Sequence, residues 1–116
     1  MAAYFSRTGG ASAPTVPTLV AVQLVTSGSY TVQLTDYYIG CNGAGITVTL
    51  PLGSTVPTGK VYVIKDESGR ATSSPSYRFT LLVSGSDTID GGPSAQIVTG
   101  YSAITVLWTG ILWSII

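Results

Sequence analysis

The C-terminal stretch from Ala103 to Ile116 reads AITVLWTGILWSII, and it decides the fold class. Its first half is continuously apolar apart from Thr105, the pair Thr109-Gly110 offers a two-residue turn, and the chain returns through Ile111 to Ile116. This pattern predicts a β-hairpin. Both of its faces are largely apolar, whereas a strand with one solvated face alternates apolar and polar residues. We therefore expect the hairpin to be buried.

Two burial sites are compatible with this hairpin. It can be pressed against other subunits, in which case Ile104, Val106, Trp108 and Trp113 are the expected subunit interface. Alternatively, it lies in the core of a single domain. The alternation of residue types does not decide between these two interpretations.

Short runs rich in β-branched residues recur upstream of the hairpin, about every ten residues, and are separated by turn signals such as Asn42-Gly43 and Asp90-Gly91-Gly92. In Ile46 to Leu50, apolar residues and threonines alternate with period two, as in a half-buried strand. The spacing predicts an all-β fold, an antiparallel β-sandwich or jelly-roll-like single domain over residues 19–116. The expected strands before the hairpin are 19–26, 30–34, 46–50, 60–65, 77–83 and 95–99.

Residues 1–18 are rich in Ala, Ser, Thr, Gly and Pro, and Tyr4 and Phe5 are their bulky aromatic groups. Pro14 and Pro17 remove backbone donors and favour extended geometry. We interpret this segment as an extended N-terminal arm that binds a neighbour through Tyr4 and Phe5. A tail without function is the alternative.

The chain carries few charges. Five basic and five acidic residues make up 9% of its 116 residues, against roughly a quarter in an ordinary soluble domain. Without a basic cluster, nucleic-acid binding is not expected. The longest apolar stretch is too short and too interrupted for a membrane helix, and the first residues do not resemble a signal peptide. A nearly uncharged surface keeps copies apart poorly, which favours a role inside an assembly.

Candidate chemistry is sparse. The chain has no histidine, the usual general base and a common metal ligand, and its single Cys41 supports neither a disulfide framework nor a metal cluster. The carboxylate pairs Asp66-Glu67 and Asp87-Asp90 are interpreted as turn-capping groups rather than as a cation site or a glycosidase pair. We expect a non-enzymatic protein that needs no metal or cofactor.

Two further stretches are open to interpretation. The glycine-rich stretch 40–45 lacks the lysine of a phosphate-binding loop and is interpreted as a flexible connection. Tyr37, Tyr38 and Tyr101 are candidate ligand-contacting residues that can stack on sugar rings if exposed, and packing groups if not.

Four segments taken in order carry a family resemblance: ITVTLP (46–51), VYVIKDESGRA (61–71), FTLLVSGSDTIDGG (79–92) and GYSAITVLWTGILWSI (100–115). Together they resemble a module of bacteriophage virion proteins, found in capsid decoration proteins, head fibres and tail-fibre tips. The resemblance covers about 70 residues, from Ile46 to the end. It implies a β-sandwich that assembles as a homotrimer and serves as a structural part of the virion.

Two functions are compatible with this resemblance. The short arm and the lack of a fibre shaft favour a capsid decoration, or cement, protein on the outer surface of the shell, whose partners are further copies of itself and the major capsid protein or another virion protein. The alternative is the receptor-binding tip of a tail or head fibre that recognises a host surface glycan or protein through loops such as 66–76. In both cases the protein is made in the host cytoplasm.

Overall fold

The computed structural model describes residues 19–116, which form nine β-strands and one short 3-10 helix. The predicted arm, with Tyr4 and Phe5, lies outside the described residues. The elements are β1 (Val22–Val25), β2 (Ser29–Thr31), β3 (Tyr38–Cys41), β4 (Thr47–Thr49), η1 (Gly53–Thr55), β5 (Val61–Asp66), β6 (Phe79–Leu82), β7 (Ser94–Ile97), β8 (Ala103–Trp108) and β9 (Trp113–Ile115).

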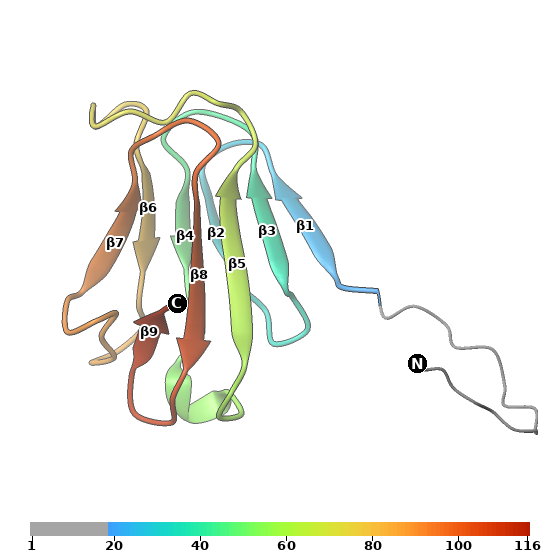
Figure 1. Ribbon diagram of the computed structural model, residues 1–116, viewed down its shortest axis with the longest axis vertical. Helices are drawn as coiled ribbons and strands as arrows, with labels where there is room; N and C mark the ends of the chain where they lie inside the picture. The colour runs from blue at the N-terminus through green and yellow to red at the C-terminus, as the bar shows by residue number, and fades with distance from the viewer. Residues whose placement is uncertain (1–18) are drawn as a thin grey trace, which may run out of the picture.

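The strands form two facing sheets, a five-stranded sheet in the order β1-β3-β5-β8-β9 and a four-stranded sheet in the order β2-β4-β6-β7 (Figure 1). From β1 to β6 the chain crosses to the other sheet after every strand, so that β1, β3 and β5 are parallel, as are β2, β4 and β6. The first six strands therefore wind as a flattened coil.

The remaining strands close the coil with antiparallel pairs, in which β7 pairs with β6, β8 with β5, and β9 with β8. The predicted all-β, sandwich-like single domain is thus confirmed. The prediction that it is antiparallel holds only for this C-terminal part.

The core fills the space between the two sheets. Trp113 is fully buried in it, with its ring centroid 5.2 Å from that of Trp108 and 5.8 Å from that of Tyr62. The burial follows the period of two expected of strands with one inward face, since β5 alternates half-buried and buried residues along its whole length. The largest fully buried side chains of the two sheets and of the residues that flank β4 are Trp113, Tyr62, Phe79, Ile39, Ile46, Leu50, Ile64 and Leu81.

Two local predictions need correction. The stretch 40–45 is not simply a flexible connection, because Gly40 and Cys41 belong to β3, the second strand of the five-stranded sheet. The turn of the final hairpin lies one residue later than predicted at Thr109-Gly110. Residues 109–112 connect the paired Trp108 and Trp113, and within them the Thr109 amide donates to the Leu112 carbonyl at 3.0 Å, which leaves Gly110 and Ile111 at the tip.

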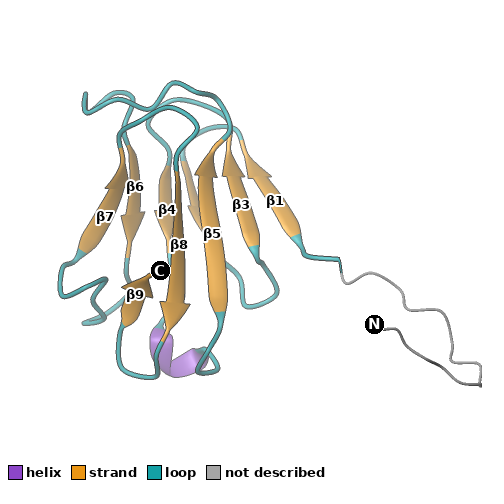
Figure 2. Cartoon of the chain, in the orientation of Figure 1, coloured by secondary structure: helices purple, strands orange, loops and turns teal. Residues whose placement is uncertain are grey.

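The connections gather at two opposite ends of the sandwich (Figure 2). We call the end formed by loops 26–28, 42–46, 67–78 and 98–102 the upper loop end, and the end formed by loops 32–37, 50–60, 83–93 and 109–112 the lower loop end. Loop 67–78, the longest connection of the described chain, lies at the upper loop end.

Candidate interaction surfaces

The five-stranded sheet has a solvent-facing side that is mostly apolar. Along β5, Tyr62 and Ile64 point into the core, so Val61, Val63 and Lys65 point outward. The strand registers place Val22, Tyr38, Val63 and Thr105 in one row across four strands. We call this surface the outer face; its residues are Val22, Leu24, Tyr38, Gly40, Val61, Val63, Lys65, Ala103, Thr105, Leu107 and Ser114.

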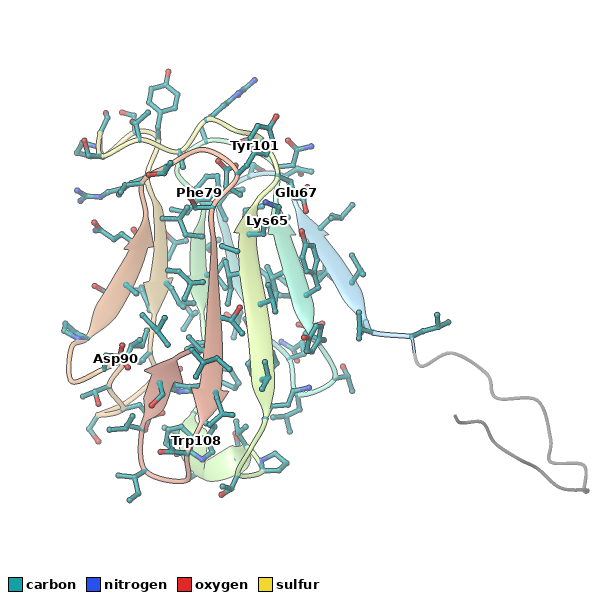
Figure 3. The ribbon with its side chains drawn as sticks, in the orientation of Figure 1. Lys65, Glu67, Phe79, Asp90, Tyr101 and Trp108 are labelled. Atoms are coloured by element: carbon teal, nitrogen blue, oxygen red, sulfur yellow. The ribbon has the colours of Figure 1, made fainter. Side chains whose placement is uncertain are left out.

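The outer face carries its charge only at its upper edge. Lys65 donates a hydrogen bond from Nζ to the Tyr101 carbonyl. Its Nζ also lies 5.7 Å from the centroid of the Tyr101 ring, within cation–π distance. Glu67, just beyond β5, accepts a hydrogen bond from the Tyr38 hydroxyl. Figure 3 shows Lys65, Glu67 and Tyr101 close together at this edge. Below them the face is free of charged residues.

Gly40 keeps the outer face flat. A Cβ at this position would lie 2.9 Å from Leu24 Cδ2 and 3.2 Å from Tyr38 Cε2. The missing side chain is therefore what lets the Tyr38 ring and the Leu24 side chain lie over β3. Leu24 and Val22 remain 61% and 60% exposed, which is a large apolar exposure for two neighbouring outward residues of one strand.

The strand β1 forms an edge of this sheet. It pairs with β3 alone among the described strands. Edge strands are ready sites for pairing with another chain unless charges or prolines protect them, and Ala21 to Val25 contain neither. The two residues that lead into β1, Leu19 and Val20, are also exposed. The apolar outer face thus continues past β1 to the point where residues 1–18 join.

The four residues predicted as a subunit interface face the core of the domain. Val106, Trp108 and Trp113 are buried within the domain, and Ile104 packs against the same core. Of the two burial sites considered for the hairpin, the structure shows the domain core for these side chains. The residues of β8 that face outward are their neighbours Ala103, Thr105 and Leu107, because a strand alternates its side chains between two faces.

The upper loop end is organised by Asp66, which is fully buried at the end of β5. Its Oδ1 accepts from the Ser68 amide at 2.7 Å, the Ser68 hydroxyl at 2.6 Å and the Gly69 amide at 3.0 Å. Its Oδ2 accepts from the amides of Ala71 and Tyr101, each at 3.1 Å. One carboxylate therefore joins the start of loop 67–78 to loop 98–102.

These donors also set the charge state of Asp66. Burial by itself would raise the pKa of Asp66, but the hydrogen bonds from Ser68, Ala71 and Tyr101 favour the carboxylate, and the resulting pKa lies below the usual value. Asp66 is therefore ionised at neutral pH although it is buried. Its role is structural, since all of these donors belong to the protein.

The three candidate ligand-contacting tyrosines do not share a site. Tyr37 lies at the lower loop end, where its carbonyl accepts from the Val63 amide at 2.8 Å. Tyr38 lies on the outer face. Tyr101 is at the upper loop end, 63% exposed, with its ring against Gly69. Of the three, only Tyr101 is placed for contact with a ligand at the upper loop end.

A shallow cavity of about 370 Å³, wide open to solvent, lies at the upper loop end and is lined by Arg70, Thr72 and Tyr77. All three side chains are solvent-exposed and belong to loop 67–78. Sequence reasoning pointed to loop 66–76 as a possible receptor contact but did not single out these residues. The signal for them was an arginine and a tyrosine within one loop, which is too common to be diagnostic without the fold.

Cys41, Asp87 and Asp90 each lie in a structural setting within residues 19–116. Cys41 is buried, and burial together with the nearby Asp66 charge raises the pKa of its thiol to about 12. Asp87 accepts from the Gly53 amide at 2.8 Å and Asp90 from the Ile115 amide at 3.1 Å, so each binds backbone at the lower loop end. The described residues hold no group of three or more histidine, cysteine or acidic side chains arranged for a metal ion.

Helices long and apolar enough to cross a membrane do not occur in the described part of the chain. Comparison with protein-family models and with curated proteins found no match for this chain.

Proposed function

We propose that this chain is a structural protein of a bacteriophage virion, a capsid decoration protein that binds the shell as a homotrimer. The observation that carries the proposal is the outer face, an apolar sheet surface with charge only at its upper edge. The resemblance of residues 46–116 to phage virion modules gives the setting. The outer face gives a surface through which three copies associate.

The size of the outer face limits the strength of association through it. The five strands are 4, 4, 6, 6 and 3 residues long, and at about 3.3 Å per residue and about 4.8 Å between strands they make a face of roughly 400 Å². Covering this face buries roughly 400 Å² of each copy, less than the roughly 800 Å² per partner of a standard-size interface. At about 25 cal/mol per Å², a wholly apolar contact of this size contributes at most ~10 kcal/mol per copy, against about 4–15 kcal/mol for lost translational and rotational freedom. Association through this face alone is therefore marginal.

A homotrimer can cover the whole outer face of each of its subunits. In a closed threefold ring each subunit offers one part of its face to one neighbour and the rest to the other, and no unpaired face remains. The edge strand β1, with its exposed Val22 and Leu24, then lies next to a neighbouring subunit. Covering β1 in this way also protects its unpaired backbone groups from unspecific pairing.

Residues 1–18 supply the contact with the shell in this proposal, with Tyr4 and Phe5 as anchors. Burying two aromatic side chains contributes roughly 3–6 kcal/mol, so deleting residues 1–18 is expected to weaken binding to empty shells by about 100-fold or more. The oligomer should persist, because the outer face is intact. Co-sedimentation with shells and sedimentation velocity measure the two properties separately. Normal shell binding by the truncated protein would contradict the role of this segment.

Receptor binding is the second candidate function, favoured by the cavity at the upper loop end. A glycan array tests it with Tyr101→Ala and Tyr37→Ala. If the upper loop end contacts a receptor, Tyr101→Ala lowers binding about tenfold, the loss typical of an aromatic contact, whereas Tyr37→Ala at the opposite end leaves it unchanged. Equal effects of both variants, or no glycan binding by the wild type, would argue against this function.

A further inference from the structure

Loop 67–78 presents a binding site of its own at the upper loop end. The volume of its shallow cavity, about 370 Å³, is at the small end of the range for ligand pockets, and the cavity is wide open to solvent. It brings together a cation at Arg70, an aromatic ring at Tyr77 and a hydroxyl at Thr72. Such a set can bind a ligand that has a negative charge, an apolar surface and hydroxyl groups in one small unit.

The loop that carries these residues is held in place on both sides. Asp66 fixes the Gly69 and Ala71 amides on either side of Arg70. On the other side, the amides of Tyr77 and Arg78 both donate to the Ser74 carbonyl at 2.9 Å. A site whose backbone is already ordered loses less conformational entropy when a ligand binds.

The loop also rests on a neighbouring connection. Gly45 of loop 42–46 approaches so closely that a Cβ there would lie 2.8 Å from the Ser76 carbonyl oxygen. With φ at +61°, this position is moreover one that favours glycine. The cavity wall beside Tyr77 is thus supported from below.

The charges around the cavity favour an anion. Residues 65–78 contain the cations Lys65, Arg70 and Arg78 and the carboxylates Asp66 and Glu67. Both carboxylates accept hydrogen bonds within the protein, Asp66 from backbone amides and Glu67 from the Tyr38 hydroxyl. Arg70, in contrast, lines the cavity and is exposed.

We propose that this cavity binds a pyranose that bears a carboxylate, such as a uronic acid unit of an acidic polysaccharide. The Arg70 guanidinium pairs with the sugar carboxylate through two parallel hydrogen bonds. The Tyr77 ring stacks on the apolar face of the pyranose. The Thr72 hydroxyl accepts from the Ser74 amide at 3.2 Å, which leaves its proton free to donate to a sugar hydroxyl. The inference deepens the second candidate function, a receptor contact at the upper loop end, by naming its ligand class, and it does not depend on capsid decoration.

Titration of the full-length protein, followed by amide chemical shifts, tests the site with three small probes. Methyl β-glucuronide has the ring and the carboxylate, methyl β-glucoside has the ring alone, and acetate has the carboxylate alone. The glucuronide should bind saturably and shift the amides of residues 70–78, and each of the other two probes should bind about tenfold more weakly or worse. No saturable binding of the glucuronide, or equal binding of acetate, would overturn the proposal.

Variants of exposed loop residues locate the site without threatening the fold. Arg70→Gln and Tyr77→Ala should each weaken glucuronide binding about tenfold, whereas Tyr77→Phe, which keeps the ring, should stay close to wild type. Arg78→Gln is the matched control, because it removes the same charge from the same loop at a residue that does not line the cavity. An equal loss in Arg70→Gln and Arg78→Gln would indicate unspecific attraction to the loop and overturn the assigned site.

Discussion

If the proposed homotrimer forms through the outer face, replacing Val63 by glutamate is expected to dissociate it while leaving the domain folded. Val63 lies in the middle of the outer face, in one row with Tyr38 and Thr105. It is half-buried in the isolated chain, so a glutamate there reaches water in the monomer but is buried in an assembly. Burying an unpaired carboxylate costs several kcal/mol, which weakens association by about 100-fold or more.

Sedimentation velocity measures this effect directly. The wild type should sediment as a species of three times the 12.0 kDa mass of one chain, and Val63→Glu as a single chain. Thr105→Glu, on the neighbouring strand, should act in the same way. Leu82→Glu is the matched control, since Leu82 is exposed at the end of β6 in the other sheet. If Leu82→Glu dissociated the oligomer and Val63→Glu did not, the outer face would not be the interface.

The substitution Asp66→Asn is expected to lower the free energy of unfolding by about 3 kcal/mol or more. The Asp66 carboxylate accepts five hydrogen bonds, three at Oδ1 and two at Oδ2. In asparagine an NH₂ group replaces one carboxylate oxygen. Its N–H groups then face two or three N–H or O–H groups of the protein, which lose their acceptor. Urea unfolding at neutral pH measures the loss. Asp87→Asn is the control, because Asp87 is only half-buried and accepts one amide hydrogen bond.

The same carboxylate gives a pH signature. Because the pKa of Asp66 is lower in the folded protein than in the unfolded chain, its contribution to stability is complete above the unfolded value of about 4. The contribution is lost as the pH falls through the lower, folded value. Asp66→Asn should therefore show a weaker loss of stability on acidification than the wild type. Identical acid profiles, or equal stability of Asp66→Asn and Asp87→Asn, would contradict the role assigned to Asp66.

The sequence predicted the strands better than their arrangement. Alternation marked most strand positions to within a few residues, because burial of one face imposes a period of two. It missed β3, where Gly40 interrupts the β-branched pattern for a reason visible only in the fold, the close approach of Leu24 and Tyr38. The residues of a strand do not indicate whether its neighbour in the sheet is parallel or antiparallel. The flattened coil of β1 to β6 was therefore not predictable from the sequence.

The C-terminal hairpin shows a second limit of prediction from the sequence, the choice between its two faces. Both faces of β8 are largely apolar, and the prediction assigned Val106 and Trp108 to a subunit interface when they are core residues. The outward residues are one position away, at Thr105 and Leu107. Side-chain size was the usable signal, because the largest aromatic groups of a small domain are needed to fill its core. The hydrogen-bond network of Asp66 was not predictable from the sequence, because one of its donors, the Tyr101 amide, lies 35 residues further along the chain.

Cryo-electron microscopy of intact virions tests the central claim most directly, because it locates the protein and its neighbours in one image. The account predicts density repeated over the capsid lattice in groups of three, with the five-stranded sheets facing a threefold axis and residues 1–18 directed to the shell. Density confined to a tail or to protruding fibres, or copies whose outer faces point to solvent, would contradict it.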